Sequence, residues 1–406
     1  MKLVTNALIV IIFLSLAFNI DLQDEGFGTD LVPALKYFTV VISLGLILFQ
    51  TAVILSNKLS FKFSKDFNFI FAFFFISLAG SLYTLIGNGF DIENSFTGRA
   101  LSVIPFFIAY LLFKHIEFDI LVKFISVITW VHIAIAFVMS TLIYYSFFTG
   151  QIYSAFTSKV IYHEEISLSL STIILISDKI KIKPFKYLLL FIIVSSGIMI
   201  WKNTSLILLF ITLFISFSIK FEKILRSRIL KIFAFSLLAL IVGQILYLVL
   251  TGSSDILPSG STEVRLATYY KRFQEFLGSP IYGSLFSGTP LVEVGWLVIP
   301  SHSDLLDVLA FGGIIGIFLF LKPIISPLIN YTKNYKHLPS EITNYYLFSI
   351  NMVACILFTL CFNPILGQPR LIIFLWFALG FVLAINERIY HPEEDVMENA
   401  EIEGNS

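Results

Sequence analysis

The segment PSHSDLLDVLAFGGIIGIFLFL, residues 300–321, passes from a polar loop directly into a run of apolar residues. From residue 304 onward the run has the composition of a helix that crosses a membrane, which needs about 20 predominantly apolar residues. Its polar start carries His302, Asp304 and Asp307. The sequence therefore places three titratable groups at one membrane boundary.

The composition of the whole chain indicates that the rest of the protein also lies largely in a membrane. Of its 406 residues, 57% are hydrophobic and 13% are charged, whereas soluble domains have about 45–50% apolar and 25% charged residues. We therefore predict an all-α integral membrane protein. The formal net charge is zero, which argues against nucleic acid as a partner.

Apolar runs separated by polar loops predict about twelve membrane-spanning helices. We expect residues 1–386 to form one polytopic membrane domain and the acidic residues 387–406 to form a disordered tail. The expected spans are residues 3–20, 37–55, 67–87, 100–114, 122–147, 160–177, 187–201, 205–219, 231–251, 304–321, 345–362 and 371–386.

The positions of the basic residues predict the orientation, because cytoplasmic loops retain lysine and arginine. With the N-terminus inside, about 19 of the 27 lysines and arginines lie on the cytoplasmic side. Both termini are then cytoplasmic. The one long external loop covers about residues 252–303.

Within this loop, residues 262–280 have the pattern of an amphipathic helix that ends at Gly278 and Pro280. Its apolar stripe, spaced i, i+4, i+7 and i+11, is formed by Leu266, Tyr270, Phe273 and Leu277. The adjacent face carries Arg265, Tyr269 and Arg272. Such a helix either lies on anionic lipid headgroups or roofs a cavity in which Arg265 holds a phosphate.

The start of the 304–321 span predicts a site for proton transfer. Ser301 stands three residues before Asp304, the spacing of a capping box, so we expect the helix to start at His302. The positive helix N-terminus keeps His302 neutral, and a neutral imidazole can accept a proton. Alternatively, His302 is only an interfacial polar residue, and Asp304 and Asp307 only complement the helix dipole.

At this loop and span the chain resembles the O-antigen polymerase and O-antigen ligase family of bacterial membrane glycosyltransferases. The resemblance covers roughly 60 residues. The matching residues are Arg265, the turn Gly278-Ser279-Pro280 with Gly283, and His302-Ser303-Asp304 followed by Gly313 and Gly316. Gly312 and Gly316 also form a GxxxG pair suited to close helix packing. The family often has an arginine where this chain has Lys202, which lacks a bidentate fork.

The resemblance implies a polymerase at the periplasmic face of a bacterial inner membrane that joins repeat units linked to undecaprenyl diphosphate. His302 would act as the base and Arg265 would stabilise the leaving diphosphate. The expected partners are the lipid-linked oligosaccharide, the bilayer and a chain-length regulator protein. No metal or cofactor is expected. Other residues expected to contact diphosphate or sugar are Arg99, Lys202, Tyr269, Arg272, Asp304 and Arg370.

Three other functions remain open at the level of sequence. A ligase would use the same chemistry but transfer the polymer to lipid A-core. A flippase for lipid-linked oligosaccharide would be a transporter, and it should carry charges deep within several spans rather than at helix ends. A structural or regulatory membrane protein is the third alternative, which the charged external loop disfavours.

Overall fold

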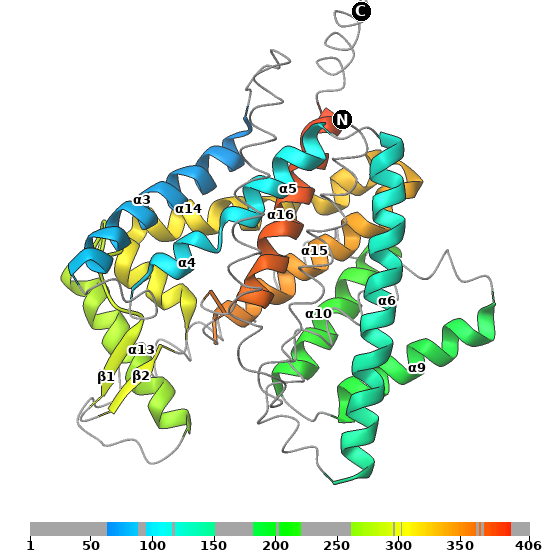
Figure 1. Cartoon of the computed structure of the whole chain (residues 1–406), viewed down its shortest axis with the longest axis horizontal. Coiled ribbons are helices and arrows are strands. Elements are labelled where there is room, and N and C mark those ends of the chain that lie inside the picture. The colour runs from blue at the N-terminus through cyan, green and yellow to red at the C-terminus, as the bar shows by residue number, and fades with distance from the viewer. Residues whose placement is uncertain are drawn as a thin grey trace, which may run out of the picture.

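The computed structural model describes residues 63–87, 95–115, 118–150, 182–199, 203–220, 261–294, 297–301, 303–362, 365–366 and 369–390. This part of the chain is mostly helical, with one small two-stranded sheet (Figure 1). Its helices are α3 (Lys65–Gly87), α4 (Thr97–Leu101), α5 (Ile104–His115), α6 (Phe118–Phe148), α9 (Lys183–Met199), α10 (Asn203–Lys220), α13 (Ser261–Gly278), α14 (Asp304–Asn334), the short 3-10 helix η2 (Tyr335–His337), α15 (Ser340–Leu360) and α16 (Pro369–Tyr390).

Within the described residues, four helical segments are long and apolar enough to cross a membrane. They are Lys65–Gly87, Thr97–Lys114, Asp304–His337 and Ser340–Leu360. The predicted spans at 67–87, 100–114, 304–321 and 345–362 are therefore confirmed as apolar helices of membrane length. The predicted spans at 3–20, 37–55, 160–177 and 231–251 lie outside the described residues.

Helices α14 and α16 extend beyond the predicted bounds. Helix α14 continues to Asn334, beyond the expected end at residue 321, although it contains Pro323 and Pro327. The boundary predicted between residues 386 and 387 falls inside α16, which continues to Tyr390. Residues 391–406 of the predicted tail lie outside the described part.

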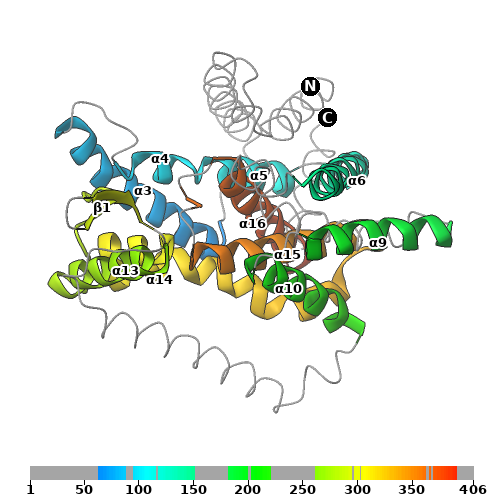
Figure 2. The ribbon, with the colours of Figure 1, turned by 90° about the horizontal axis from the view of Figure 1, so that it is seen from below.

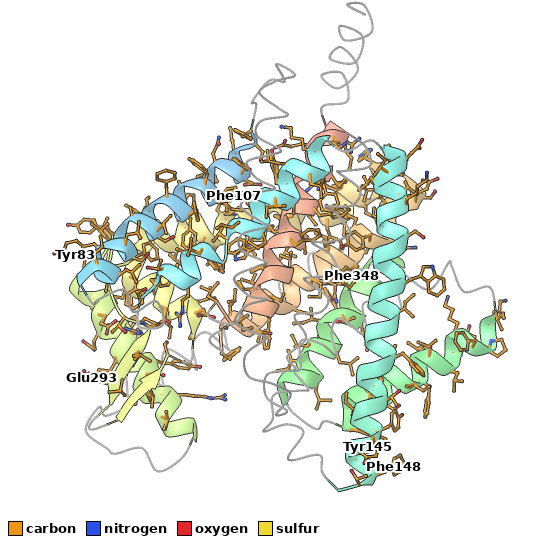
Figure 3. All side chains as sticks on the ribbon, in the orientation of Figure 1. Tyr83, Phe107, Tyr145, Phe148, Glu293 and Phe348 are labelled. Atoms are coloured by element: carbon orange, nitrogen blue, oxygen red, sulfur yellow. The ribbon has the colours of Figure 1, made fainter. Side chains whose placement is uncertain are left out.

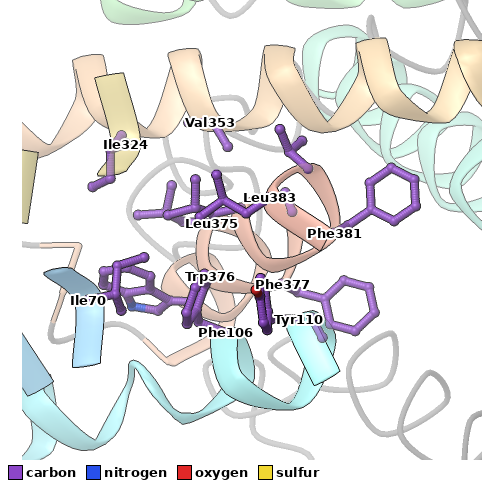
Figure 4. Close-up of a cluster of buried hydrophobic side chains, with 14 of the residues drawn as sticks. Ile70, Phe106, Tyr110, Ile324, Val353, Leu375, Trp376, Phe377, Phe381 and Leu383 are labelled. Atoms are coloured by element: carbon purple, nitrogen blue, oxygen red, sulfur yellow. The ribbon is translucent and has the colours of Figure 1, made fainter. Parts of the chain in front are cut away.

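The core forms where α16 packs along α5 on one side and α15 on another (Figure 4). Gly380 of α16 allows a close approach, since a Cβ atom there would lie 2.6 Å from the carbonyl oxygen of Phe106. Rings then interlock, with Trp376 packing edge-on against Phe106 and Phe381 against Phe113. Small residues at helix contacts and tight ring packing are typical of helix association in lipid.

Helices α5, α14 and α16 run in the same direction. Arg99, just before α5, contacts Asp304 at the start of α14, which in turn binds the backbone of Leu366 just before α16. At the opposite end, Tyr110 of α5 binds Glu387 of α16, and Asn334 of α14 binds Asn386. We call these the α13 end and the η2 end of the bundle.

The α13 end carries most of the described part of the predicted external loop. Helix α13 lies beside the start of α14, next to an antiparallel hairpin of β1 (Leu291–Val294) and β2 (Leu297–Pro300) (Figures 1 and 2). The amphipathic helix is confirmed, including its end at Gly278. The hairpin is a small exception to the all-α prediction, and Glu293 marks its position in Figure 3.

Candidate functional site

Four charged side chains meet at the α13 end, and all four are buried. Arg99 is 6% exposed, Arg272 is 2% exposed, and Asp304 and Asp307 are fully buried. They come from α4, α13 and the first turn of α14. We call this group the charge cluster. Its formal charges sum to zero when all four groups are ionised.

Arg272 is held by protein groups on every side of its guanidinium. Its Nε atom lies 2.7 Å from Oδ1 of Asp307, an ion pair without hydrogen-bond geometry. Its Nη2 donates to the carbonyl oxygens of Thr289 and Leu291, at 2.7 and 3.2 Å. Its Nη1 donates to Glu275 at 2.7 Å, and the ring of Phe311 lies 4.6 Å from the guanidinium carbon. The hairpin, α13 and α14 are thus joined by one side chain.

Arg99 completes the charge cluster from α4. Its Nη1 donates a hydrogen bond to Asp307 and lies 3.3 Å from Oδ1 of Asp304. Asp304 Oδ2 accepts a hydrogen bond from the backbone N–H of Leu366 at 2.7 Å. Each aspartate therefore contacts groups from at least two other parts of the chain. Removing one member of such a buried set costs about 3–5 kcal/mol, because a charge is left uncompensated.

The cap of α14 differs from the predicted capping box. Ser303, and not Ser301, is the N-cap residue, and its hydroxyl accepts a hydrogen bond from the backbone N–H of Leu306 at 3.3 Å. The helix therefore starts at Asp304, and His302 precedes it. The prediction was wrong because Asp304 does not face back toward a cap but toward Arg99 and Leu366.

Helix α14 is broken at Gly313, where φ is +61° and ψ is −159°. A segment of the predicted external loop, residues 279–287, is inserted against the break. Carbonyl oxygens of Pro280 and Ile281 accept from the N–H groups of Ile314 and Ile315, at 2.9 and 3.1 Å. A break within a membrane helix must be satisfied in this way, since lipid offers no hydrogen bonds.

The inserted segment fits only because of glycines on α14 and α3. A Cβ atom on Gly312 would lie 2.6 Å from the ring of Phe286, and one on Gly316 would lie 3.1 Å from it. A Cβ atom on Gly80 of α3 would collide with the carbonyl oxygen of Leu285. The GxxxG pair thus serves close packing as predicted, but its neighbour is an aromatic ring and not a second helix.

Arg265, Tyr269 and Arg272 occupy different environments, although they share one face of α13. Arg265 is exposed, whereas Tyr269 is 7% exposed and Arg272 is buried. Burial raises the pKa of Tyr269 above its ordinary value of 10.0, while nearby Arg265 acts in the opposite direction. The helix therefore packs on the protein through its polar face.

The predicted apolar stripe of α13 is not its buried side. Leu277 is 52% exposed, and Leu266, Tyr270 and Phe273 are only partly buried. The periodicity of the sequence identified the apolar stripe of α13, but it did not determine which face of the helix packs against the rest of the protein.

The remaining predicted site residues are described less fully. His302 and Lys202 lie outside the described residues, and Arg370 is described only as the second residue of α16. The structure brings together Arg99, Arg272 and Asp304 and adds Asp307. Sequence reasoning treated Asp307 only as a complement to the helix dipole. Two aspartates at i and i+3 on an apolar helix were the signal that two cations must lie nearby.

Comparison with known proteins does not assign a family. A scan against protein-family models gave no match, and a search of curated proteins found no similar sequence.

Proposed function

We propose that this protein is a membrane glycosyltransferase that polymerises surface polysaccharide from repeat units linked to undecaprenyl diphosphate. In this proposal the chain crosses a bacterial inner membrane about twelve times, with both termini in the cytoplasm. The observation that carries it is the charge cluster, which fixes the external helix α13 to the start of α14, directly after His302. The residues that resemble the O-antigen polymerase family lie in these same elements.

The parallel direction of α5, α14 and α16 supports the proposed topology. In that topology the fourth, tenth and twelfth spans all pass from the outside to the inside. The α13 end would then face the periplasm, where lipid-linked repeat units are polymerised in the family that the chain resembles.

In the proposed reaction, a sugar hydroxyl of the acceptor attacks the anomeric carbon of the donor glycan. His302 takes the hydroxyl proton as the new C–O bond forms. The bond from the anomeric carbon to the diphosphate oxygen breaks, and undecaprenyl diphosphate leaves with the bonding electrons. Direct displacement inverts the configuration at the anomeric carbon.

Arg265 is the cation assigned to the leaving diphosphate. It is exposed on α13, about 10 Å along the helix axis from the buried Arg272. A guanidinium can hold two phosphate oxygens at once, and it stabilises charge that develops there. Lys202 and Arg370 remain proposed helpers in binding the diphosphate.

Arg99 and Arg272 receive a different role from the one the sequence suggested. Both are buried, and both are engaged by aspartates. We assign them, with Asp304 and Asp307, to positioning α13 and the start of α14 rather than to direct contact with substrate. Tyr269 is buried one turn after Arg265 on the same helix, and we assign it to holding α13 against the protein.

The test is a gel of surface polysaccharide from cells that lack the gene, complemented with wild type or with His302→Ala. A ladder restored by wild type, and lipid A-core with a single repeat unit in the variant, would support a polymerase that requires His302. A full ladder with His302→Ala would refute the mechanism.

The same gel separates the other functions. Bare core with polymer still attached to its lipid carrier would indicate a ligase. Bare core with repeat units that are not exported would indicate a flippase and overturn the proposed enzyme.

A further inference from the structure

A second polar site lies at the η2 end of the bundle, far from the charge cluster. It is a cavity of about 370 Å³ between the start of α3, the last turns of α14 and the end of α16. Along α14 it is separated from Asp304 by more than 20 residues, which corresponds to about 30 Å or more. Six of its polar lining residues are Asp66, Ser326, Asn330, Lys333, Asn386 and Glu387.

Glu387 presents unused hydrogen-bonding capacity at this cavity. Its Oε2 atom accepts from the hydroxyl of Tyr110 at 2.5 Å and lies 3.0 Å from Nζ of Lys114. Its Oε1 atom is buried without a hydrogen-bond partner among the described residues. An unused buried carboxylate oxygen is costly, so a side-chain movement that turns it toward an N–H donor in the cavity would be favourable.

Charged groups of both signs line the cavity. Asp66 and Glu387 supply two carboxylates, and Lys333 supplies one ammonium group. Lys114 pairs with Glu387, and Lys322 lies near Asp66. A ligand with separate positive and negative groups can pair with both kinds of lining residue.

An exposed apolar side chain lies close to these residues along α14. Ile329, next to Asn330 on α14, is 71% exposed, and it lies within one of the segments that are long and apolar enough to cross a membrane. A molecule with its polar group in the cavity can therefore lay a hydrocarbon chain against α14.

We propose that the cavity binds the headgroup of a zwitterionic phospholipid that carries a primary ammonium group. The ammonium group pairs with the carboxylates of Asp66 and Glu387, and Lys333 at the rim binds the phosphate. Ser326, Asn330 and Asn386 supply further hydrogen bonds. This site is separate from the proposed catalytic site and does not depend on the proposed function.

The experiment measures which lipid stays bound to the purified full-length protein. Detergent-solubilised protein is equilibrated with equal amounts of dioleoyl phosphatidylethanolamine, phosphatidylcholine and phosphatidylglycerol, and retained lipids are quantified by mass spectrometry. We expect phosphatidylethanolamine to be enriched about tenfold over phosphatidylcholine, whose methylated ammonium has no N–H donor. Phosphatidylglycerol, which lacks an ammonium group, should not be enriched.

Variants locate the binding. Glu387→Gln and Asp66→Asn should each abolish the enrichment. Asn330→Leu, which replaces a polar lining group by an apolar one of similar size, should do so without touching an ion pair. Glu293→Gln on the exposed hairpin is the matched control and should retain it. Each variant is first checked for monodispersity and thermal stability in phosphatidylcholine, so that loss of fold is recognised.

Three results would overturn the proposal. One is equal retention of the three lipids by wild type, and another is preferential retention of phosphatidylglycerol. The third is unchanged enrichment in both Glu387→Gln and Asn330→Leu. Free phosphoethanolamine is added as a competitor, and displacement at concentrations equal to those of the lipid would indicate a soluble ligand instead. A loss of polysaccharide in cells has no bearing on this readout.

Discussion

Asp307 contacts two arginines that are 173 positions apart in the sequence, Arg99 and Arg272. Without it, Arg99 would keep only Asp304 as an acidic partner, and Arg272 would keep only the half-exposed Glu275. A buried charge that loses a partner is disfavoured away from water. The same carboxylate therefore fixes the distance between α4, α13 and α14. At the scale of single residues, the site is organised by pairing of charges and not by one dominant group.

Asp307→Ala should destabilise the protein by about 3–5 kcal/mol, because two buried guanidiniums lose their shared partner. The thermal midpoint of detergent-solubilised protein measures this loss. Glu275→Ala is the matched control, since Glu275 also pairs with Arg272 but is 46% exposed, and it should cost less than about 1 kcal/mol. Equal midpoints for the two variants would contradict the role given to the charge cluster.

The two arginines of α13 should respond differently to replacement by lysine. Arg265→Lys keeps the charge but loses the bidentate fork, so polymer formation should fall at least about tenfold while the thermal midpoint stays at the wild-type value. Arg272→Lys cannot reach Asp307, Thr289 and Leu291 together, so its midpoint should fall. Full activity of Arg265→Lys would contradict the assignment of Arg265 to the diphosphate. It would favour the alternative in which α13 lies on lipid headgroups.

The buried Tyr269 predicts a dependence of stability on pH. Because burial raises its pKa, the folded protein keeps this proton above about pH 10, where the unfolded chain begins to lose it. Unfolding then releases a proton, so stability falls as the pH rises. Between about pH 9 and 11 wild type should lose more stability than Tyr269→Phe. Parallel curves for the two proteins would show that Tyr269 titrates normally.

At the scale of elements, the break in α14 decides how the predicted external loop enters the bundle. Residues 279–287 replace the helical hydrogen bonds that are lost around Gly313. The segment also carries positive φ angles at Gly283, Leu285 and Phe286. Thr84 of α3 donates to the carbonyl oxygen of Ser287 at 2.5 Å and holds its far end. Loop and helix therefore form one unit.

Gly313→Ala should destabilise this unit. Its backbone conformation is accessible almost only to glycine, at a cost of about 1–3 kcal/mol for other residues. The added Cβ atom would also collide with the backbone at Ile281. Gly278→Ala, where a Cβ atom meets nothing within 4 Å, is the control and should keep the wild-type thermal midpoint. A stable Gly313→Ala variant would mean that α14 is not broken there.

Element prediction from the sequence succeeded where the signal is local. Long apolar runs predicted the helices of membrane length, and the pattern of residues 262–280 predicted α13 with its end at Gly278. The inserted segment was recognised only as a turn, because its partners on α14 and α3 are distant in the sequence. The cap was assigned to Ser301 for a similar reason, since the contacts of Asp304 with Arg99 and Leu366 are long-range.

At the scale of the whole molecule, polar groups gather at the two ends of one apolar bundle. The charge cluster occupies the α13 end, and the cavity with Asp66 and Glu387 occupies the η2 end. Charges at helix ends were expected from the sequence, but their assembly into two sites was not, because hydropathy does not determine which spans are neighbours.

Cysteine labelling tests the proposed orientation of this bundle. The background for this test carries Cys355→Ser and Cys361→Ser. In cells whose outer membrane is permeabilised and whose inner membrane is intact, Glu293→Cys on the hairpin should react with a membrane-impermeant maleimide. Glu341→Cys, exposed at the start of α15, should react only once the inner membrane is opened. The reverse pattern would place the α13 end in the cytoplasm and exclude a periplasmic reaction.

The most direct test of the proposed function is the reaction of purified protein in liposomes with its own cell's undecaprenyl-diphosphate-linked repeat unit. Released undecaprenyl diphosphate and lengthened glycan are measured together. Wild type should produce both in equal amounts, one carrier released for each bond formed, and His302→Ala should produce neither. Equal products from wild type and His302→Ala, or lengthened glycan without released carrier, would contradict the proposed mechanism.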